Sequence, residues 1–432
     1  MPIGSRAPSW RDASRLPVWR DRRFLVLVAL GFASGVPWPL VAGQVLRQWF
    51  TEAGLSLTEI GLTALIGWAY SLKFLWSPLL DEAPPLLRRL GRRRGWLALI
   101  QPCLIAAILL LGLQDPALAP VGAASLAVLV AFLSASQDIA VDAWRIEVLE
   151  EREQGYGLAC YVWGYRFALL ASGAGTLWLV APLGWAGAYA FAAGLAGIGL
   201  LGTLLAPAEP RAPSLPVGWR ARLHAGVVQP FADFIRRRHW LPILLFVALF
   251  KLGEALAAVM TTPFYRQLGF AREDVATVGT VFGLAATLAG ALAGGWLVAR
   301  LGTARALVLT GLGQMLSNLM YVALAFAGHD LPMLWAQVGV EAFTDGLADA
   351  AFLTYLSALT SRAFTATQYA LLSSLAAVPL RTMGAASGWL AEALGWPGFF
   401  LLTTAAALPA MGIMLWLLRR LPPPVRPDVV VA

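Results

Sequence analysis

Residues 134–149 read SASQDIAVDAWRIEVL and close a long apolar run with two acidic side chains. Asp138 and Asp142 are four residues apart and Arg145 follows three residues later, so all three side chains lie along one face of an α-helix. An ionisable side chain inside a membrane helix costs about 3 kcal/mol on insertion scales, so it marks a functional site by default. The stretch therefore predicts a site within a membrane, provided that this helix crosses a bilayer.

The composition is that of an integral membrane protein. Of the 432 residues, 59% are hydrophobic and 13% are charged, whereas soluble domains average about 25% charged residues. The net charge of +8 could indicate nucleic-acid binding. Its distribution along the chain fits the positive-inside rule of membrane proteins better, so we expect no nucleic-acid partner.

Residue patterns for catalysis or metal binding are absent from the sequence. Cys103 and Cys160 both fall inside apolar runs, where cysteine is a small packing residue rather than a disulfide or metal ligand. The chain has no P-loop, no zinc-type spacing and no nucleotide-binding glycine motif after a strand. We therefore expect neither an enzyme nor a cofactor.

Twelve apolar runs are long enough, at about 20 residues each, to cross roughly 30 Å of hydrocarbon. They cover residues 24–43, 57–80, 96–113, 119–146, 156–181, 185–206, 240–263, 274–299, 305–327, 332–359, 366–391 and 396–418. The arginine-rich first 23 residues contain no signal-peptide cleavage pattern, so the first helix is expected to remain. Arginines collect at both termini and in every second loop, which predicts cytoplasmic N- and C-termini.

The longest polar segment, residues 207–239, divides the chain into two halves of six helices. We expect residues 1–206 to form the N-terminal six-helix bundle with a cytoplasmic arm, and residues 240–432 to form the C-terminal bundle. The segment between them begins as a Pro-rich cytoplasmic linker and ends in a possible amphipathic helix on the inner leaflet.

The two halves resemble each other. YRFALLASGAGTLW in the fifth helix parallels PLRTMGAASGWL in the eleventh, and Asp138 and Asp142 of the fourth helix match Asp345 and Asp349 of the tenth. Duplicated halves are typical of secondary transporters with a midplane site between the repeats. The pattern resembles the major facilitator architecture, an all-α membrane protein of twelve transmembrane helices in two pseudo-symmetric six-helix bundles.

The loop between the second and third helices reads SPLLDEAPPLLRRLGRRRGW. Major facilitators carry a loop of similar type, in which an acid and a basic cluster hold the cytoplasmic side together during part of the cycle. By this resemblance Asp81, Arg92, Arg93 and Arg94 are gating residues. The alternative is that the arginines only set topology and bind anionic lipid.

Eleven ionisable residues fall inside the expected membrane helices. They are Lys73, Arg145, Arg166, Lys251, Arg381, Asp138, Asp142, Glu254, Glu341, Asp345 and Asp349. The chain has no lysine other than Lys73 and Lys251, which suggests that a compact ammonium is needed at both positions. The alternative is structural ion pairing, for example between Lys251 and Glu254. The three histidines lie in loops or at helix ends, so proton coupling would depend on carboxylates.

Motifs of a recognisable kind occur in most of the expected helices. They are LGFASGVPWPL in the first helix, KFLWSPLLD and GRRRGW around the second loop, SASQDIAVDAW in the fourth, GYR in the fifth, KLGEA and TTPF in the seventh, GVEAF in the tenth and ATQYALLS in the eleventh. These motifs are similar to those of the AmpG-type muropeptide permeases of the bacterial inner membrane. The matches run in order over nearly the whole chain. The chain departs from the family pattern in its acids at 345 and 349 and at Thr280, where a lysine is common.

The resemblance implies import of N-acetylglucosaminyl-1,6-anhydro-N-acetylmuramic acid and its peptides for peptidoglycan recycling, by alternating access and driven by protons. The proton-coupling candidates are Asp138, Asp142, Glu254 and Glu341. The substrate-binding candidates are Lys73, Arg166, Lys251, Tyr70, Gln137 and Trp163, with the cations facing the lactyl and peptide carboxylates. The expected partners are an anionic glycopeptide, protons and the lipid bilayer, and the expected state is a monomer.

Three other functions stay open at this point. A related major facilitator could carry another bulky anion such as acetyl-coenzyme A, or it could export drugs. A membrane receptor could bind cell-wall fragments without moving them. Fold alone does not decide among these functions.

Overall fold

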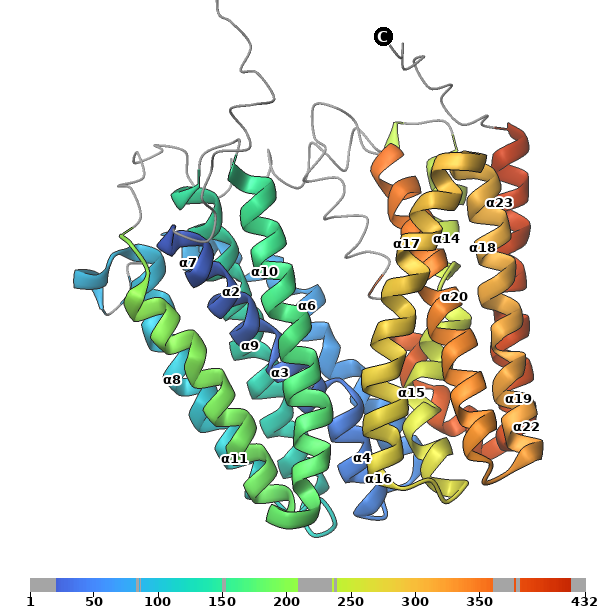
Figure 1. The fold of residues 1–432 in the computed structure, drawn as a ribbon, viewed down its shortest axis with the longest axis horizontal. Helices are drawn as coiled ribbons and strands as arrows, with labels where there is room; N and C mark the ends of the chain where they lie inside the picture. The colour runs from blue at the N-terminus through green and yellow to red at the C-terminus, as the bar shows by residue number, and fades with distance from the viewer. Residues whose placement is uncertain are drawn as a thin grey trace, which may run out of the picture.

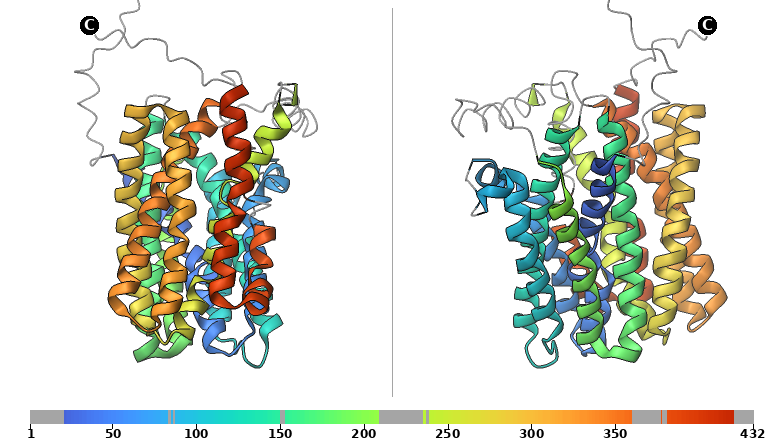
Figure 2. Two further views of the ribbon diagram at one scale, coloured as in Figure 1. Left: turned by 90° about the vertical axis from the view of Figure 1, so that its right-hand side faces the viewer. Right: turned by 60° about the vertical axis from the view of Figure 1, so that its left-hand side comes forward.

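A computed structural model describes residues 21–82, 85, 87–149, 153–208, 235–236, 239–359, 377 and 381–420. Within this part of the chain every regular element is a helix, and the helices form two groups that lie side by side (Figure 1). Two further views show the helices of both groups running along a common direction (Figure 2). The expected all-helical fold is confirmed.

The first group holds the helices up to residue 205. They are α2 (Arg22–Gly35), α3 (Pro37–Val41), α4 (Gln44–Glu52), α5 (Leu57–Leu62), η2 (Thr63–Gly67), α6 (Trp68–Ser71), η3 (Lys73–Leu75), α7 (Ser77–Glu82), η4 (Arg88–Leu90), α8 (Arg92–Gly112), α9 (Pro120–Val148), α10 (Gln154–Ala168), η6 (Leu169–Ala174) and α11 (Gly175–Leu205).

The second group begins at residue 240. Its helices are α14 (Trp240–Leu249), α15 (Leu252–Gln267), α16 (Arg272–Asp274), η8 (Val275–Phe282), α17 (Gly283–Leu301), α18 (Thr303–Ser317), α19 (Leu319–Ala327), α20 (Leu331–Ala358), α22 (Ser387–Ala406) and α23 (Leu408–Arg420). We call these two groups the N-half and the C-half.

Eight helical stretches among the described residues are long and apolar enough to cross a membrane. Most of the expected eleventh span, 366–391, and of the linker 207–239 lies outside the described residues, so the count of twelve and the domain limits stay predictions. The first span was expected to end at residue 43. It continues instead through the polar helix α4 to Glu52.

Two tight turns repeat between the halves. The tripeptide Leu-Gly-Trp occurs at 183–185 and at 394–396, and its glycine has φ of 70° in α11 and 66° in α22. Positive φ is readily adopted by glycine, because it has no Cβ to clash with the backbone. Each glycine therefore turns one membrane helix back into the next, at equivalent places in the two halves.

Several membrane helices are interrupted near their middle. Pro37 follows the end of α2, and the second span consists of five short segments from α5 to α7. The two lysines of the chain lie at such breaks: Lys73 opens η3, and Lys251 lies between α14 and α15. Interrupted helices at membrane depth commonly mark the binding site of a transporter, because their free backbone groups must be satisfied by protein, water or ligand.

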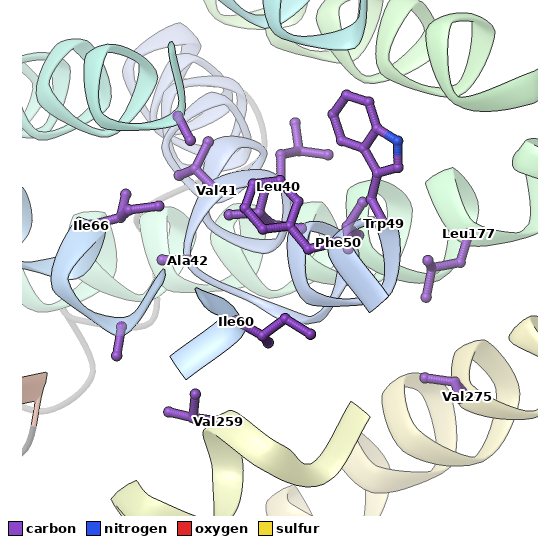
Figure 3. Close-up of a cluster of buried hydrophobic side chains, with 14 of the residues drawn as sticks. Leu40, Val41, Ala42, Trp49, Phe50, Ile60, Ile66, Leu177, Val259 and Val275 are labelled. Atoms are coloured by element: carbon purple, nitrogen blue, oxygen red, sulfur yellow. The ribbon is translucent and has the colours of Figure 1, made fainter. Parts of the chain in front are cut away.

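The hydrophobic core shows where the halves meet. One cluster of buried side chains combines residues of both halves, and Figure 3 shows Val259 and Val275 of the C-half facing Ile60 and Leu177 of the N-half. Two further clusters each stay within one half. Both of these clusters lie towards the end of the molecule where α2 begins and α23 ends, which we call the terminal end. Among the described residues the halves thus share a core only towards the opposite end, which we call the closed end.

Candidate transport site

The closed end is held by contacts between the halves. Glu52 of α4 accepts hydrogen bonds from Arg272 Nε at 2.8 Å and Nη2 at 2.9 Å, and Arg266 Nη2 lies 3.8 Å from it. Glu392 of α22 accepts from the Thr58 hydroxyl at 2.7 Å. Figure 1 shows α4 and α16 meeting at this end. A ligand cannot pass here unless these contacts break.

Close backbone approach seals the same end. A Cβ on Gly388 of α22 would collide with the carbonyl of Leu57, and one on Gly61 would lie 2.9 Å from the carbonyl of Ala385. The spaces left by two glycines, one in each half, therefore let α5 and α22 touch along their backbones.

A cavity of about 340 Å³ lies between the halves, within the size range of ligand pockets. Glu341 and Asp345 of α20 line it from the C-half, and Trp38, Gln44 and Arg47 line it from the N-half. The amide of Gln44 donates to the Thr280 hydroxyl across the interface. A cavity lined by both halves will change shape when they move relative to each other.

Lys251 is the centre of a charged cluster on the C-half side. Its ammonium lies 2.9 Å from Glu254, 2.8 Å from Asp345 and 2.5 Å from Asp349. Gln314 of α18 donates to Glu254 at 2.6 Å and to Asp345 at 3.2 Å. The Lys251–Glu254 ion pair, given above as the structural alternative, is present, and it is one part of a centre in which three carboxylates surround one ammonium.

Asp345 and Asp349, the acids that depart from the family pattern, complete this centre. They lie one and two helical turns after Glu341 on α20, so the three acids share one face of the helix. The interruption of the seventh span at Lys251 brings the ammonium against that face. The sequence repeat identified Asp345 and Asp349 as a pair, but a contact between distant helices could not be read from helical spacing.

The acids of the opening stretch lie on the N-half side. Asp138 interacts electrostatically with Lys73 and Asp142, and its Oδ1 atom is buried without a hydrogen-bond partner. Asp142 pairs at 3.5 Å with Arg145, which lies three residues later on the same helix face. Lys73 of the second span therefore lies near the two acids of α9, a neighbourhood that the sequence did not indicate, and the roles expected for these three residues stay predictions.

The other expected substrate contacts are more dispersed. Tyr70 Oη and Gln137 Nε2 are buried and have no hydrogen-bond partner. Arg166 is exposed on α10 and attracts Asp349 of the C-half electrostatically. Trp163 leaves 61% of its surface exposed, with its ring beside Phe167, and is not among the residues that line the cavity.

At the terminal end the expected basic cluster has an acidic partner that the sequence motif did not indicate. Glu147 of α9 accepts from Arg92 at 2.9 Å and from Arg93 at 2.8 Å. Arg94 donates to the backbone carbonyl of Thr203 at 3.3 Å. Asp81 lies in α7, but its side chain is outside the described part, so its gating role stays a prediction. These contacts join helices of one half.

Comparison with known proteins supports the same fold. The family model of the Major Facilitator Superfamily matches residues 23–380 and 252–430. A bacterial homologue of the human lysosomal transporter Spinster, in an inward-facing and unoccupied conformation, has a TM-score of 0.70 at 17% identity, covering 93% of this chain and 98% of its own. The nucleoside transporter NupG has a TM-score of 0.68 at 13% identity, covering 92% and 99%. At such identities these structures show the fold alone.

A curated relative is much more similar in sequence. The anhydromuropeptide permease of Escherichia coli K12 is 42% identical over 403 residues, which cover 93% of this chain and 80% of the relative. Fold and cavity define a multi-span membrane transporter of small molecules rather than an enzyme. The chain belongs to the Major Facilitator Superfamily and, within it, to the family of the anhydromuropeptide permeases.

Proposed function

We propose that this protein imports anhydromuropeptides, the disaccharide N-acetylglucosaminyl-1,6-anhydro-N-acetylmuramic acid and its peptides, across a bacterial inner membrane. The observation that carries this proposal is the 42% identity to the anhydromuropeptide permease over 93% of the chain. The cavity between the halves supports it, because Glu341, Asp345 and Gln44 provide polar groups for a sugar beside the aromatic ring of Trp38. The imported fragments would serve peptidoglycan recycling.

The terminal end is assigned to the cytoplasm. Arg22, Arg93 and Arg419 lie at this end, and positive residues are retained on the cytoplasmic side of membrane proteins. The two bundles, 1–206 and 240–432, are then closed towards the periplasm, with the linker 207–239 in the cytoplasm. The conformation is inward-facing, the state from which an importer releases its substrate.

Proton coupling is assigned to the cluster around Lys251. With all groups ionised, three carboxylates and one ammonium have a net charge of −2, and uncompensated charge within a membrane is costly. A bound proton lowers that cost and removes an acceptor from the ammonium, so proton binding and the ion pairing of Lys251 with the acids of α20 change together. Since its ammonium is already surrounded by acids, Lys251 acts in coupling rather than in substrate binding.

Glu254 and Glu341 take part in the same coupling step. Glu341 lines the cavity one turn before Asp345, so it connects the cluster to the bound substrate. Asp138 and Asp142 form a second acidic group with Lys73 in the N-half. Arg166 of the N-half attracts Asp349 of the C-half. The protein works as a monomer, because the cavity is formed by the two halves of one chain.

Uptake into vesicles tests this function. The purified protein is reconstituted, and labelled anhydro-disaccharide is offered with and without an imposed pH gradient. We expect accumulation above the outside concentration only when protons flow in with the substrate. Asp345→Asn should lose gradient-driven accumulation while exchange of labelled for unlabelled substrate continues, because only the coupling step is removed. Normal accumulation by Asp345→Asn would reject the Lys251 cluster as the coupling site, and no uptake by the unmodified protein would reject the transport function.

A further inference from the structure

Arg381 belongs to the C-half but reaches into the N-half. It lies in the helical segment 381–385 just before α22, and its guanidinium is 5.5 Å from the centre of the Trp38 ring. A Cβ on Gly67 would come within 2.8 Å of Arg381 Nη1, so the bare glycine in η2 makes room for the guanidinium. The Arg381 side chain therefore extends from the segment before α22 to η2 of the second span, at the boundary of the two halves.

The polar atoms around this arginine lack partners. Arg381 Nη1 is buried without a hydrogen-bond partner, and so is the hydroxyl of Tyr70. The Tyr70 ring stands edge-on to Trp38 with ring centres 5.1 Å apart, and Tyr70 interacts electrostatically with Arg381. A buried donor left unpaired costs about 1–3 kcal/mol, and more when it is charged. A ligand with a suitable acceptor would pair the Arg381 donor and the Tyr70 hydroxyl together.

Lys251, Arg47 and Lys73 near the interface already have charged or hydrogen-bonding neighbours, and of their polar atoms Arg47 Nε, like Arg381 Nη1, is buried without a partner. Lys251 is surrounded by three carboxylates, and Arg47 donates through both of its Nη atoms to the carbonyls of Ala258 and Ala42. Lys73 has Asp138 as its charged neighbour. Arg381 Nη1 differs from Arg47 Nε in lying near the buried Tyr70 hydroxyl at the boundary of the halves, an arrangement that an incoming anion can use.

We propose that Arg381, Tyr70 and Trp38 form the subsite for the carboxylate of the sugar acid. The guanidinium fork binds one carboxylate with two parallel N–H groups, and the Tyr70 hydroxyl donates to an oxygen of the same group. Trp38 holds the guanidinium in place through its ring face. Because Arg381 comes from the C-half and its two companions from the N-half, a bound carboxylate connects the halves. The inference rests on the proposed function, since the anhydromuramic acid unit supplies the carboxylate.

The test compares two ligands that differ at a single carboxyl group, which is ionised in one and amidated in the other. Binding of the anhydro-disaccharide and of its lactyl methylamide is measured by titration calorimetry on the purified full chain. The unmodified protein should prefer the acid. Arg381→Gln should bind the acid about 10- to 100-fold more weakly, which is the contribution of one charge-assisted contact, and bind the amide unchanged. Arg381→Lys keeps the positive charge but lacks the two parallel N–H groups, so its affinity for the acid should lie between those of the unmodified protein and Arg381→Gln.

Arg272→Gln is the matched control. Arg272 also crosses between the halves, but it contacts Glu52 at the closed end, so its loss should change the affinities for acid and amide by the same factor. Equal weakening of both ligands in Arg381→Gln, or an unchanged preference for the acid in both Arg381 variants, would overturn the subsite. If the unmodified protein binds neither ligand, the proposed function fails and the subsite fails with it. If both ligands bind, the ratio of the affinities for acid and amide in the Arg381 variants decides whether Arg381 binds the carboxylate.

Discussion

Glu52→Gln should open the closed end. The Glu52 and Arg272 side chains are 16% and 22% exposed and are joined by two hydrogen bonds of 2.8 and 2.9 Å. Fully exposed pairs contribute about 0.2–1 kcal/mol, and hydrogen bonds to charged groups about 1.5–3 kcal/mol. For this partly buried pair we expect about 1.5 kcal/mol, which shifts the ratio of closed to open molecules roughly tenfold.

Distance measurements between spin labels report this shift. Cys103 and Cys160 are first replaced by alanine, and labels are attached to Leu118→Cys in the N-half and Leu331→Cys in the C-half. Both positions are exposed in the described structure, and both lie at the closed end, in the loop before α9 and at the start of α20. In Glu52→Gln the fraction of molecules with the longer distance between the two labels, in which this end is open, should increase, and the fraction with the shorter distance should decrease.

Glu59→Gln is the control for the loss of charge. Glu59 lies near the same end, but it accepts hydrogen bonds from Ser56 within its own half. Its substitution should leave the distance distribution unchanged. An unaltered distribution in Glu52→Gln, or an equal change in Glu59→Gln, would refute the view that contacts between the halves hold this end shut.

Three further outcomes are expected. Lys251→Met should lower the melting temperature strongly, since removing one partner of a buried ionic cluster costs about 3–5 kcal/mol. An unchanged melting temperature would mean that Glu254, Asp345 and Asp349 are protonated when the ammonium is absent. Gly388→Val should abolish transport without unfolding the protein, because its side chain collides with the Leu57 carbonyl and prevents closure; uptake at the normal rate would contradict the seal. Glu147→Gln should reduce the free energy of unfolding by about 1–2 kcal/mol in a denaturant titration, because Arg93, only 7% exposed, loses the Glu147 carboxylate. An unchanged free energy of unfolding would favour the alternative that the arginines bind lipid.

Much of the fold follows from the sequence for simple physical reasons. Hydrophobic runs of membrane length predict the helices, because unpaired backbone groups cannot face lipid. The helix interruptions were harder to predict: Pro37 is an evident breaker, whereas the break at Lys251 has no proline or glycine immediately before it. The polar extension to Glu52 was missed, because its apolar face packs within the protein rather than against lipid.

The candidate site was predicted in part. Buried charge is rare enough in a membrane protein that Asp138, Glu254 and Lys251 stand out from the sequence alone. Their partners depend on helix packing, which sequence spacing does not specify, so the enclosure of Lys251 by Asp345 could not be foreseen. Arg381 was recognised only as one charge among several, since its unpaired donor is a property of the folded chain.

The pH inside sealed vesicles tests the central claim most directly. Vesicles containing the protein and a trapped pH-sensitive dye start with equal pH on both sides, and anhydro-disaccharide is then added outside, with the membrane potential clamped. If substrate enters together with protons, the lumen acidifies at a rate that follows substrate uptake and stops when Asp345→Asn replaces the unmodified protein. Entry of labelled substrate with no change in internal pH would contradict proton-coupled import.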